Sequence, residues 1–191
     1  MIQNRCFGLV LAGGESKRMG TDKSQLTYHH LPQREHVAGL LEKFCAKVFI
    51  SVRNPESITS FPVLSDIFPS EGPLTGIVTA ISARPDVAWL FAPVDMPWLD
   101  EETIDFLINN RLPGFEITCF TDASGKLPEP LLSIWEPFIF TEVLKYYEEG
   151  GRSVLKFIET RRANLITAPH PEKIKNVNTP EQLNQFYRKR K

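Results

Sequence analysis

The fold of this chain is decided in Phe7-Gly-Leu-Val-Leu-Ala-Gly-Gly-Glu-Ser-Lys-Arg-Met-Gly-Thr-Asp-Lys23. The apolar run from Phe7 to Leu11 has the length of a buried strand. It breaks at Gly13-Gly14, where two missing Cβ atoms let the backbone adopt φ > 0 and approach a ligand closely. Backbone N–H groups beside lysine and arginine side chains suit an anion with several oxygens, such as a triphosphate. The stretch therefore predicts a strand followed by a phosphate-binding loop.

Spacing excludes two common phosphate loops. A Walker A loop needs four residues between its glycines and a lysine directly after the second one. Here five residues separate Gly14 from Gly20, and Thr21 follows. The dinucleotide fingerprint G-x-G-x-x-G is also absent, because Gly13 and Gly14 are adjacent.

The composition is that of a globular domain, with 42% hydrophobic and 24% charged residues over 191 residues. The formal net charge of −1 gives no field that would favour nucleic acid or an anionic membrane. The cysteines Cys6, Cys45 and Cys119 are odd in number and lack C-x-x-C spacing. We expect small buried thiols in a cytoplasmic protein, with no nucleic-acid or membrane partner.

Strand and helix patterns alternate over the first 110 residues. Apolar strand candidates lie at 7–11, 48–52, 62–64 and 87–92. Helical patterns begin at Pro32, cover 77–83 after a loop over 71–76, and run from about 100 to 110. Such alternation predicts an α/β fold, a Rossmann-like three-layer sandwich with a mainly parallel sheet. The length favours a single domain over 1–191.

The second half of the chain is less regular. Runs at 116–120 and 131–135 flank a polar turn and suggest a hairpin-like excursion. Helices are expected over about 137–149 and 152–160, followed by a short strand at 165–167. Near the end, Thr179 and Gln182 have the spacing of a capping box for a closing helix.

Polar residues follow the predicted parallel strands at Gly13-Gly14, Arg53-Asn54, Asp66 and Asp95. Because ligands bind beyond the carboxyl ends of parallel strands, these positions should converge on one crevice. A carboxylate such as Asp95, facing bound phosphates, is a common Mg²⁺ ligand. A turn aspartate that caps backbone N–H groups is the alternative for this residue.

Several motifs together resemble those of the MobA-like nucleotidyltransferases, which make molybdenum cofactor dinucleotides. The loop matches L-A-G-G-x-S-x-R-M-G-x-D-K, and the region around Asp95 matches D-x-P-x-L. Asp66 stands six residues before Gly72-Pro-Leu-Thr-Gly-Ile77, and Asn176-Val-Asn-Thr-Pro-Glu181 completes the series. The resemblance covers nearly the whole chain, with its motifs in the expected order.

The resemblance implies a set of site residues. The catalytic ones are Arg18, Lys23 and Asp95, and the metal ligand for Mg²⁺ is Asp95, with Asn178 as a weaker second. The implied nucleotide-binding residues are Leu11, Ala12, Gly13, Gly14, Lys23, Arg53, Asn54, Asp66, Gly72, Pro73, Leu74, Gly76 and Asp95. Either Arg53 or Asn54 corresponds to the family's nucleotide-contacting asparagine. Where many members have Gln-Pro-Leu, this chain has Glu129-Pro-Leu131.

The resemblance also implies a reaction, in which GMP passes from GTP to the molybdopterin cofactor and pyrophosphate is released. Residues 1–110 would bind the nucleotide and residues 111–191 the acceptor. Proteins that deliver the cofactor and mature molybdoenzymes would be partners. Two alternatives stay open on the residues alone: a CTP-dependent cofactor cytidylyltransferase or another small-molecule nucleotidyltransferase, and a nucleotide- or cofactor-binding protein without catalysis.

Overall fold

The computed structural model describes residues 6–12, 30–52, 59–69, 71–122, 125, 127–179 and 181–183. Its strands are β1 Phe7–Leu11, β2 Lys47–Val52, β3 Val63–Ser65, β4 Trp89–Pro93, β5 Ile117–Thr121, β6 Pro128–Trp135 and β7 Ala163–Ile166. Its α-helices are α1 Gln33–Glu42, α2 Pro73–Ala83, α3 Glu101–Asn109, α4 Phe140–Glu148 and α5 Val154–Glu159. The 3₁₀ helices η2 Pro137–Ile139 and η3 Pro171–Ile174 complete these elements.

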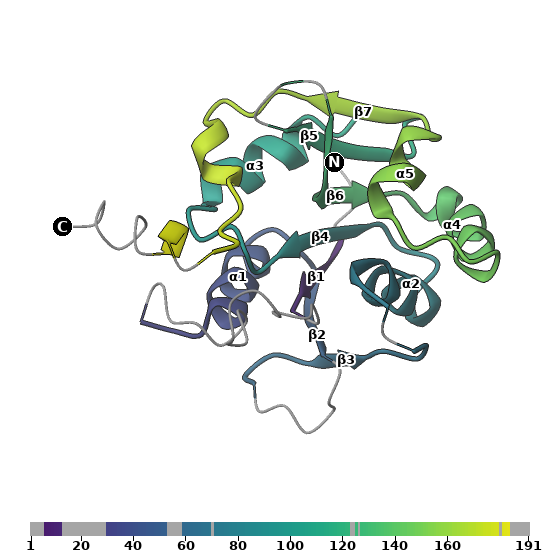
Figure 1. The fold of residues 1–191 in the computed structure, drawn as a ribbon, viewed down its shortest axis with the longest axis horizontal. Helices are drawn as coiled ribbons and strands as arrows, with labels where there is room; N and C mark the ends of the chain where they lie inside the picture. Colours follow the sequence, from purple (N-terminus) through teal and green to yellow (C-terminus); the bar gives the residue numbers. More distant parts are fainter. Residues whose placement is uncertain are drawn as a thin grey trace.

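One seven-stranded sheet, in the order β3-β2-β1-β4-β6-β5-β7, forms the middle layer (Figure 1). Strands β3, β2, β1 and β4 are parallel neighbours, as are β5 and β7. Only β6 among these strands runs the other way, antiparallel to both β4 and β5. The expected mainly parallel sheet is confirmed, and so is the hairpin-like pair in the second half.

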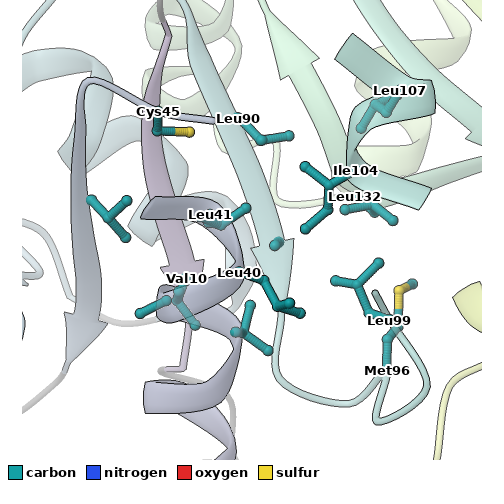
Figure 2. Packing of buried hydrophobic residues seen from close by; sticks show 14 of the residues in the cluster. Val10, Leu40, Leu41, Cys45, Leu90, Met96, Leu99, Ile104, Leu107 and Leu132 are labelled. Carbon is teal, nitrogen blue, oxygen red and sulfur yellow. The ribbon is translucent and has the colours of Figure 1, made fainter. Parts of the chain in front are cut away.

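Helices cover both faces of the sheet, which gives the expected three layers (Figure 1). On one face, α1 and α3 bury Val37, Leu41, Ile104 and Leu107 against strand residues (Figure 2). On the other face, α2, α4 and α5 bury a second cluster that includes Ile77, Val143, Phe157 and Trp135. Within the part of the chain described, no helix is long and apolar enough to cross a membrane.

Several elements begin or end at other residues than the sequence patterns indicate. Helix α2 begins at Pro73 rather than at Ile77, so most of the loop expected over 71–76 is the first helical turn. Gly72 precedes it with φ of 120°, which a side chain would disfavour, and Pro73 supplies a helical φ at the first position. Pro32 caps α1 instead of opening it. Strand β6 begins at Pro128, three residues before the expected start.

Local capping signals are confirmed where the structure describes them. The Gln182 N–H donates to Thr179 Oγ1 at 3.3 Å, and the Thr179 N–H donates to Gln182 Oε1 at 3.2 Å. Ser153 accepts from the Lys156 N–H at the start of α5. Gly150, with φ of 90°, follows the end of α4. These signals act within a few residues, which is why the sequence predicts them well.

Candidate active site

The carboxyl ends of the first four strands meet at one edge of the sheet. Leu11 at the end of β1 is in register with Ser51 of β2 and Pro93 of β4, and Val52 is in register with Ser65. The chain therefore leaves the sheet at this edge through Ala12, Asp66 and Asp95. Of the positions predicted to converge, Asp66 and Asp95 both follow strand ends at this edge. The predicted site residues Gly13, Gly14, Arg18, Lys23, Arg53 and Asn54 lie outside the described residues.

Asp95 lies in a turn whose neighbours are anchored in the core. Val94, Met96 and Leu99 are buried, and Met96 and Leu99 belong to the cluster in Figure 2. The Leu99 N–H donates to the Met96 carbonyl at 3.2 Å. Asp95 itself is half-buried at the end of β4. The apolar side chains on either side thus fix the backbone that carries the carboxylate.

The segment 176–178 passes directly beside Asp95. The Val177 N–H donates to the Asp95 carbonyl oxygen at 2.7 Å, and the Val177 side chain is fully buried. Asn178, one residue further on, is exposed. Its backbone N–H donates to Gln182 Oε1 at 2.6 Å, so the capping box holds this segment. The backbone just before Asn178 is therefore held beside the backbone of Asp95, although the two residues are more than 80 positions apart in the sequence.

The oxygen donors at this edge fit Mg²⁺. Mg²⁺ prefers carboxylate and carbonyl oxygens, keeps several waters, and takes further ligands from substrate phosphates. Among the described residues, no group of three His, Cys, Asp or Glu side chains is placed to hold a metal ion by itself. A site of one carboxylate at Asp95 and an amide at Asn178 suits an ion that arrives with a nucleotide rather than a permanently bound one.

Glu129 is a further acidic residue beside this candidate site, not among the site residues predicted from the sequence. It is the second residue of β6, and it lies near enough to Asp95 for the two negative charges to interact. Glu129 accepts a hydrogen bond from Asn176 Nδ2 at 3.4 Å. Burial raises the pKa of Glu129 to about 7, and the negative charge of Asp95 acts in the same direction. The signal in the sequence was Glu129-Pro-Leu131, which stands where many family members have Gln-Pro-Leu.

The predicted residues before and within α2 have different surroundings. Asp66 is half-buried after β3, and its N–H donates to the Val52 carbonyl at 3.4 Å. Pro73 is exposed and Gly72 is half-buried. Leu74, however, is 1% exposed and packs in the core. A Cβ at Gly76 would lie 2.8 Å from Ser51 Oγ, so Gly76 allows close packing of α2 on the sheet.

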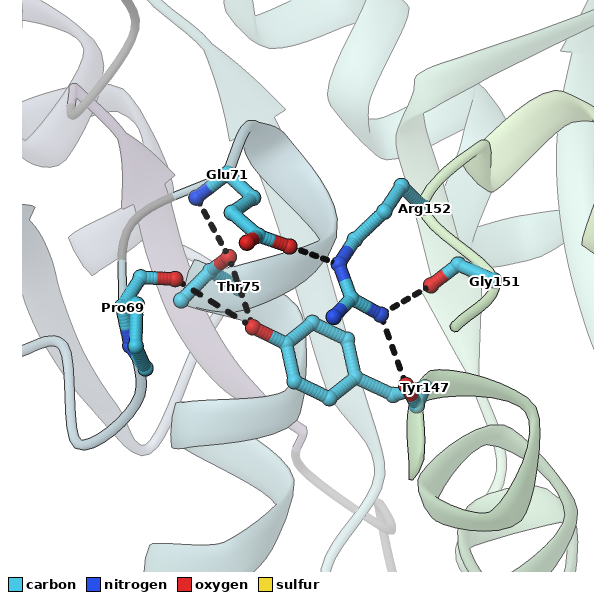
Figure 3. A network of polar contacts seen from close by, with 6 residues as sticks. All are labelled: Pro69, Glu71, Thr75, Tyr147, Gly151 and Arg152. Carbon is cyan, nitrogen blue, oxygen red and sulfur yellow. Dashed lines mark hydrogen bonds and ion pairs between the residues drawn. The ribbon is translucent and has the colours of Figure 1, made fainter. Parts of the chain in front are cut away.

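A polar network ties the segment before α2 to the second half of the chain (Figure 3). Arg152, just before α5, forms an ion pair with Glu71 and donates to the Tyr147 carbonyl at 2.6 Å. The Tyr147 hydroxyl is 3.2 Å from Thr75 Oγ1 and donates to the Pro69 carbonyl at 3.4 Å. The Arg152 guanidinium also lies over the Tyr147 ring at 4.1 Å. The network fixes the predicted base-binding segment relative to α4 and α5.

Comparisons with known proteins agree with this fold and site. A family model described as the MobA-like NTP transferase domain matches residues 8–164. By class, the chain is therefore a nucleotidyltransferase. It belongs to the MobA-like family, as its sequence motifs predict.

Individual relatives extend the match to almost the full chain. The molybdenum cofactor guanylyltransferase of Xanthomonas euvesicatoria pv. vesicatoria is 31% identical over 190 residues, covering 97% of this chain and 96% of the relative. A molybdenum cofactor biosynthesis bifunctional protein of Synechocystis is also 31% identical, over 96% of this chain, but the chain spans only 54% of that protein's length.

A solved structure shares the fold. The crystal structure of molybdopterin-guanine dinucleotide biosynthesis protein A from Archaeoglobus fulgidus superposes with a TM-score of 0.79 at 20% identity. The superposition covers 94% of this chain and 96% of the Archaeoglobus fulgidus chain. This likeness confirms the Rossmann-like α/β fold expected from the sequence, which is of the nucleotide-diphospho-sugar transferase type.

Proposed function

We propose that this protein transfers GMP from GTP to the molybdenum–molybdopterin cofactor, forming the guanine dinucleotide cofactor and releasing pyrophosphate. The observation that supports the proposal is that Asp66 and Asp95 follow strands whose carboxyl ends lie at one edge of the sheet, with Val177 hydrogen-bonded to the Asp95 backbone, in a chain of this family. A relative of nearly the same length is named molybdenum cofactor guanylyltransferase, which supports GTP and this acceptor as the substrates.

In the proposed reaction, an oxygen of the cofactor's terminal phosphate attacks the α-phosphorus of GTP. A new P–O bond forms, and the bond from the α-phosphorus to the β-phosphate oxygen breaks, so that pyrophosphate leaves. A phosphate nucleophile carries its own negative charge, so the residues need mainly to position the substrates and offset charge. Lys23 and Arg18 are proposed to bind the departing phosphates through their positive charge.

We assign Asp95 and Asn178 as the residues that would hold Mg²⁺ beside the phosphates. When bound, Mg²⁺ would supply charge neutralisation for the phosphate oxygens. The anchored turn 94–99 keeps the Asp95 carboxylate in place, and the Val177 N–H bond to the Asp95 carbonyl keeps Asn178 close to it. Asp66 and Gly72 are proposed to contact the base and ribose.

We also propose a division of labour, in which residues 1–110 bind the nucleotide and residues 111–191 bind the acceptor. Two residues of the second half interact with the first half near the candidate site: Glu129, through its charge, with Asp95, and Arg152, through an ion pair, with Glu71. Proteins that deliver the cofactor and molybdoenzymes that receive it are the proposed partners. The three cysteines are free and buried, which fits a proposed place in the reducing cytoplasm.

The experiment measures pyrophosphate release with the molybdopterin cofactor, Mg²⁺ and either GTP or CTP. We expect release with GTP, and we expect Asp95→Ala to lower its rate by at least about 100-fold, since a metal ligand contributes several kcal/mol. Asp86→Ala is the matched control, because Asp86 is exposed and its carboxylate pairs with the nearby Arg84. This control should retain the parent rate.

Other outcomes would assign the protein a different function or overturn the role of Asp95. Release with CTP alone would keep the fold and mechanism but make the protein a cytidylyltransferase. Nucleotide binding without release under any condition would favour a binding protein. Full activity in Asp95→Ala would overturn the role of Asp95.

A further inference from the structure

Two thiols lie side by side at the end of the sheet away from the candidate active site. Cys6 immediately precedes β1 and Cys45 lies in the connection before β2, so both are at the amino ends of these strands. Their Sγ atoms are 3.8 Å apart. The Ala46 N–H donates to the Cys6 carbonyl at 3.0 Å, which makes the two backbones direct neighbours here. Figure 2 places Cys45 at the opposite end of the cluster from Met96.

A glycine in β1 leaves the space that the sulfur atoms occupy. Cys6 and Gly8 are two residues apart and lie on the same face of the extended chain. A Cβ at Gly8 would lie 3.1 Å from Cys45 Sγ. The Cys45 side chain thus folds over Gly8 toward Cys6, and the thiol pair is built into the packing of β1 against its neighbour.

The contact between the thiols prepares one of them for reaction. The pKa of the Cys6 thiol is lowered, chiefly because the Cys45 thiol donates a hydrogen bond to it, and the positive charge of Arg111 acts in the same direction. A thiolate is the form of cysteine that attacks peroxides and disulfides. Cys119 differs, because it is fully buried and burial raises its pKa to about 12.

A cavity reaches the Cys45 side of the pair. Its volume is about 500 Å³, and Cys45 contributes to its wall together with Lys47, Phe61 and Pro62. Cys45 is 7% exposed and Cys6 is 4% exposed. A molecule the size of hydrogen peroxide fits such a space easily, whereas direct exposure of the thiols to large reagents is small.

We propose that Cys6 and Cys45 form a peroxide-oxidisable dithiol, a modification site separate from the nucleotidyltransferase site. The Cys6 thiolate attacks one oxygen of hydrogen peroxide, the O–O bond breaks, and Cys6 becomes a sulfenic acid while hydroxide takes up a proton to give water. The Cys45 sulfur then attacks the Cys6 sulfur and displaces the hydroxyl group as a second water. Two thiols are oxidised to one disulfide, and one peroxide is reduced to two waters.

The disulfide would close a segment that contains the whole predicted phosphate loop. Residues 7–44 lie between the two cysteines, and Gly13, Gly14 and Lys23 lie within that range. Closing a chain segment restricts the unfolded state, so the oxidised protein should unfold at a higher urea concentration. The two sulfur atoms lie at the amino ends of the strands, whereas Asp95 lies beyond a carboxyl end. The expected rise in stability therefore does not depend on the proposed reaction.

The test treats the folded protein with hydrogen peroxide and measures intact mass, cross-linked peptides and the urea midpoint. We expect a mass loss of about 2 Da that dithiothreitol reverses, because two hydrogens leave when the disulfide forms. Peptide mapping should join Cys6 to Cys45, and the urea midpoint should rise. Cys6→Ala and Cys45→Ala should each abolish the mass loss, whereas the matched control Cys119→Ala should retain it.

The proposal is overturned by any of three results. The first is an unchanged mass in the folded parent protein after peroxide treatment. The second is a gain of about 32 Da on one cysteine without a cross-link, the mark of a sulfinic acid. The third is a cross-link that persists in a folded Cys45→Ala variant. Because peptide mapping of the parent protein identifies the bonded pair directly, the test holds even where a variant fails to fold.

Discussion

Strands β3, β2, β1 and β4 bring their carboxyl ends to the candidate active site, whereas β6 brings its amino end to the same edge. In the first half of the chain, the residues after each strand are the ones that reach the site, and Asp66 and Asp95 follow this rule. In the second half, Glu129 reaches the site from the start of a strand. The rule that ligands bind beyond the carboxyl ends of strands therefore identifies Asp66 and Asp95 as candidates but not Glu129.

The two halves also differ in how they are held together. In the first half, α1 connects the parallel neighbours β1 and β2, α2 connects β3 to β4, and the two helices pack on opposite faces of the sheet. The second half is joined to the first by the β4–β6 pairing and by the network around Arg152 and Tyr147 (Figure 3). If these junctions are strong, the halves should unfold together; if they are weak, each half should behave as a separate unit.

The largest expected effect comes from Trp135, which joins the halves. Trp135 in β6 is fully buried, meets Phe91 of β4 edge to face at 5.8 Å, and stacks on Phe157 of α5 at 5.5 Å. Trp135→Ala should lower the free energy of unfolding by roughly 3–5 kcal/mol. Urea unfolding followed by circular dichroism should show one transition at a lower midpoint.

Phe138→Ala provides the comparison, since Phe138 is 60% exposed. Its free energy of unfolding should stay within about 0.5 kcal/mol of the parent. Two separate transitions in Trp135→Ala would mean that the halves are independent units, contrary to the expectation of one domain.

A smaller effect, dependent on pH, is expected at Glu129. Its pKa in the folded state is about 7, against an ordinary value of 4.5. The folded protein therefore holds this proton more tightly than the unfolded chain, and stability falls as pH rises from about 4.5 to 7. Glu129→Gln carries no charge, so it should be more stable than the parent above pH 7, by up to about 3 kcal/mol.

The measurement is urea unfolding of parent and variant at pH 5 and pH 8. The stabilisation by Glu129→Gln should be large at pH 8 and small at pH 5. Glu148→Gln serves as the control, because Glu148 is exposed on α4 and lies away from the site. Equal stabilisation at both pH values would show that Glu129 is not held protonated by its surroundings.

The smallest effect concerns close packing in the first half. Gly76→Ala should lower the free energy of unfolding by about 1–3 kcal/mol, because the new methyl group would lie 2.8 Å from Ser51 Oγ. Gly39→Ala is the matched control in α1, where a Cβ meets nothing within 4 Å. It should raise stability by about 0.5–1 kcal/mol through helix propensity.

A double variant sharpens this comparison. Ser51→Ala removes the hydroxyl that the new methyl group would meet, so adding it to Gly76→Ala should recover part of the lost stability. Thermal and urea unfolding of the two single variants and the double variant measure the coupling. No recovery would mean that the backbone of α2, rather than the Ser51 hydroxyl, determines the cost.

Much of the first half is predictable from the sequence because its signals are local. The strand Phe7–Leu11 begins and ends where its apolar run does. The apolar run 87–92 predicts a strand that ends just before Asp95, and β4 ends there. The spacing of Thr179 and Gln182 predicts a capping box, which is confirmed. The start of α2 is wrong by four residues, since Gly72-Pro-Leu-Thr-Gly76 was interpreted as a loop. Its glycines and proline favour a turn in isolation, but burial of Leu74 against the core favours the helix.

The sequence by itself determined the alternation of strands and helices, the family, and the residue types that gather beyond the strand ends. Only the tertiary structure decided that β6 is inserted antiparallel between β4 and β5, that the charges of Glu129 and Asp95 interact, and that Cys6 meets Cys45. The physical reason is distance along the chain. Periodicity and capping depend on residues a few positions apart, whereas strand order and these contacts depend on the packing of segments dozens of residues apart.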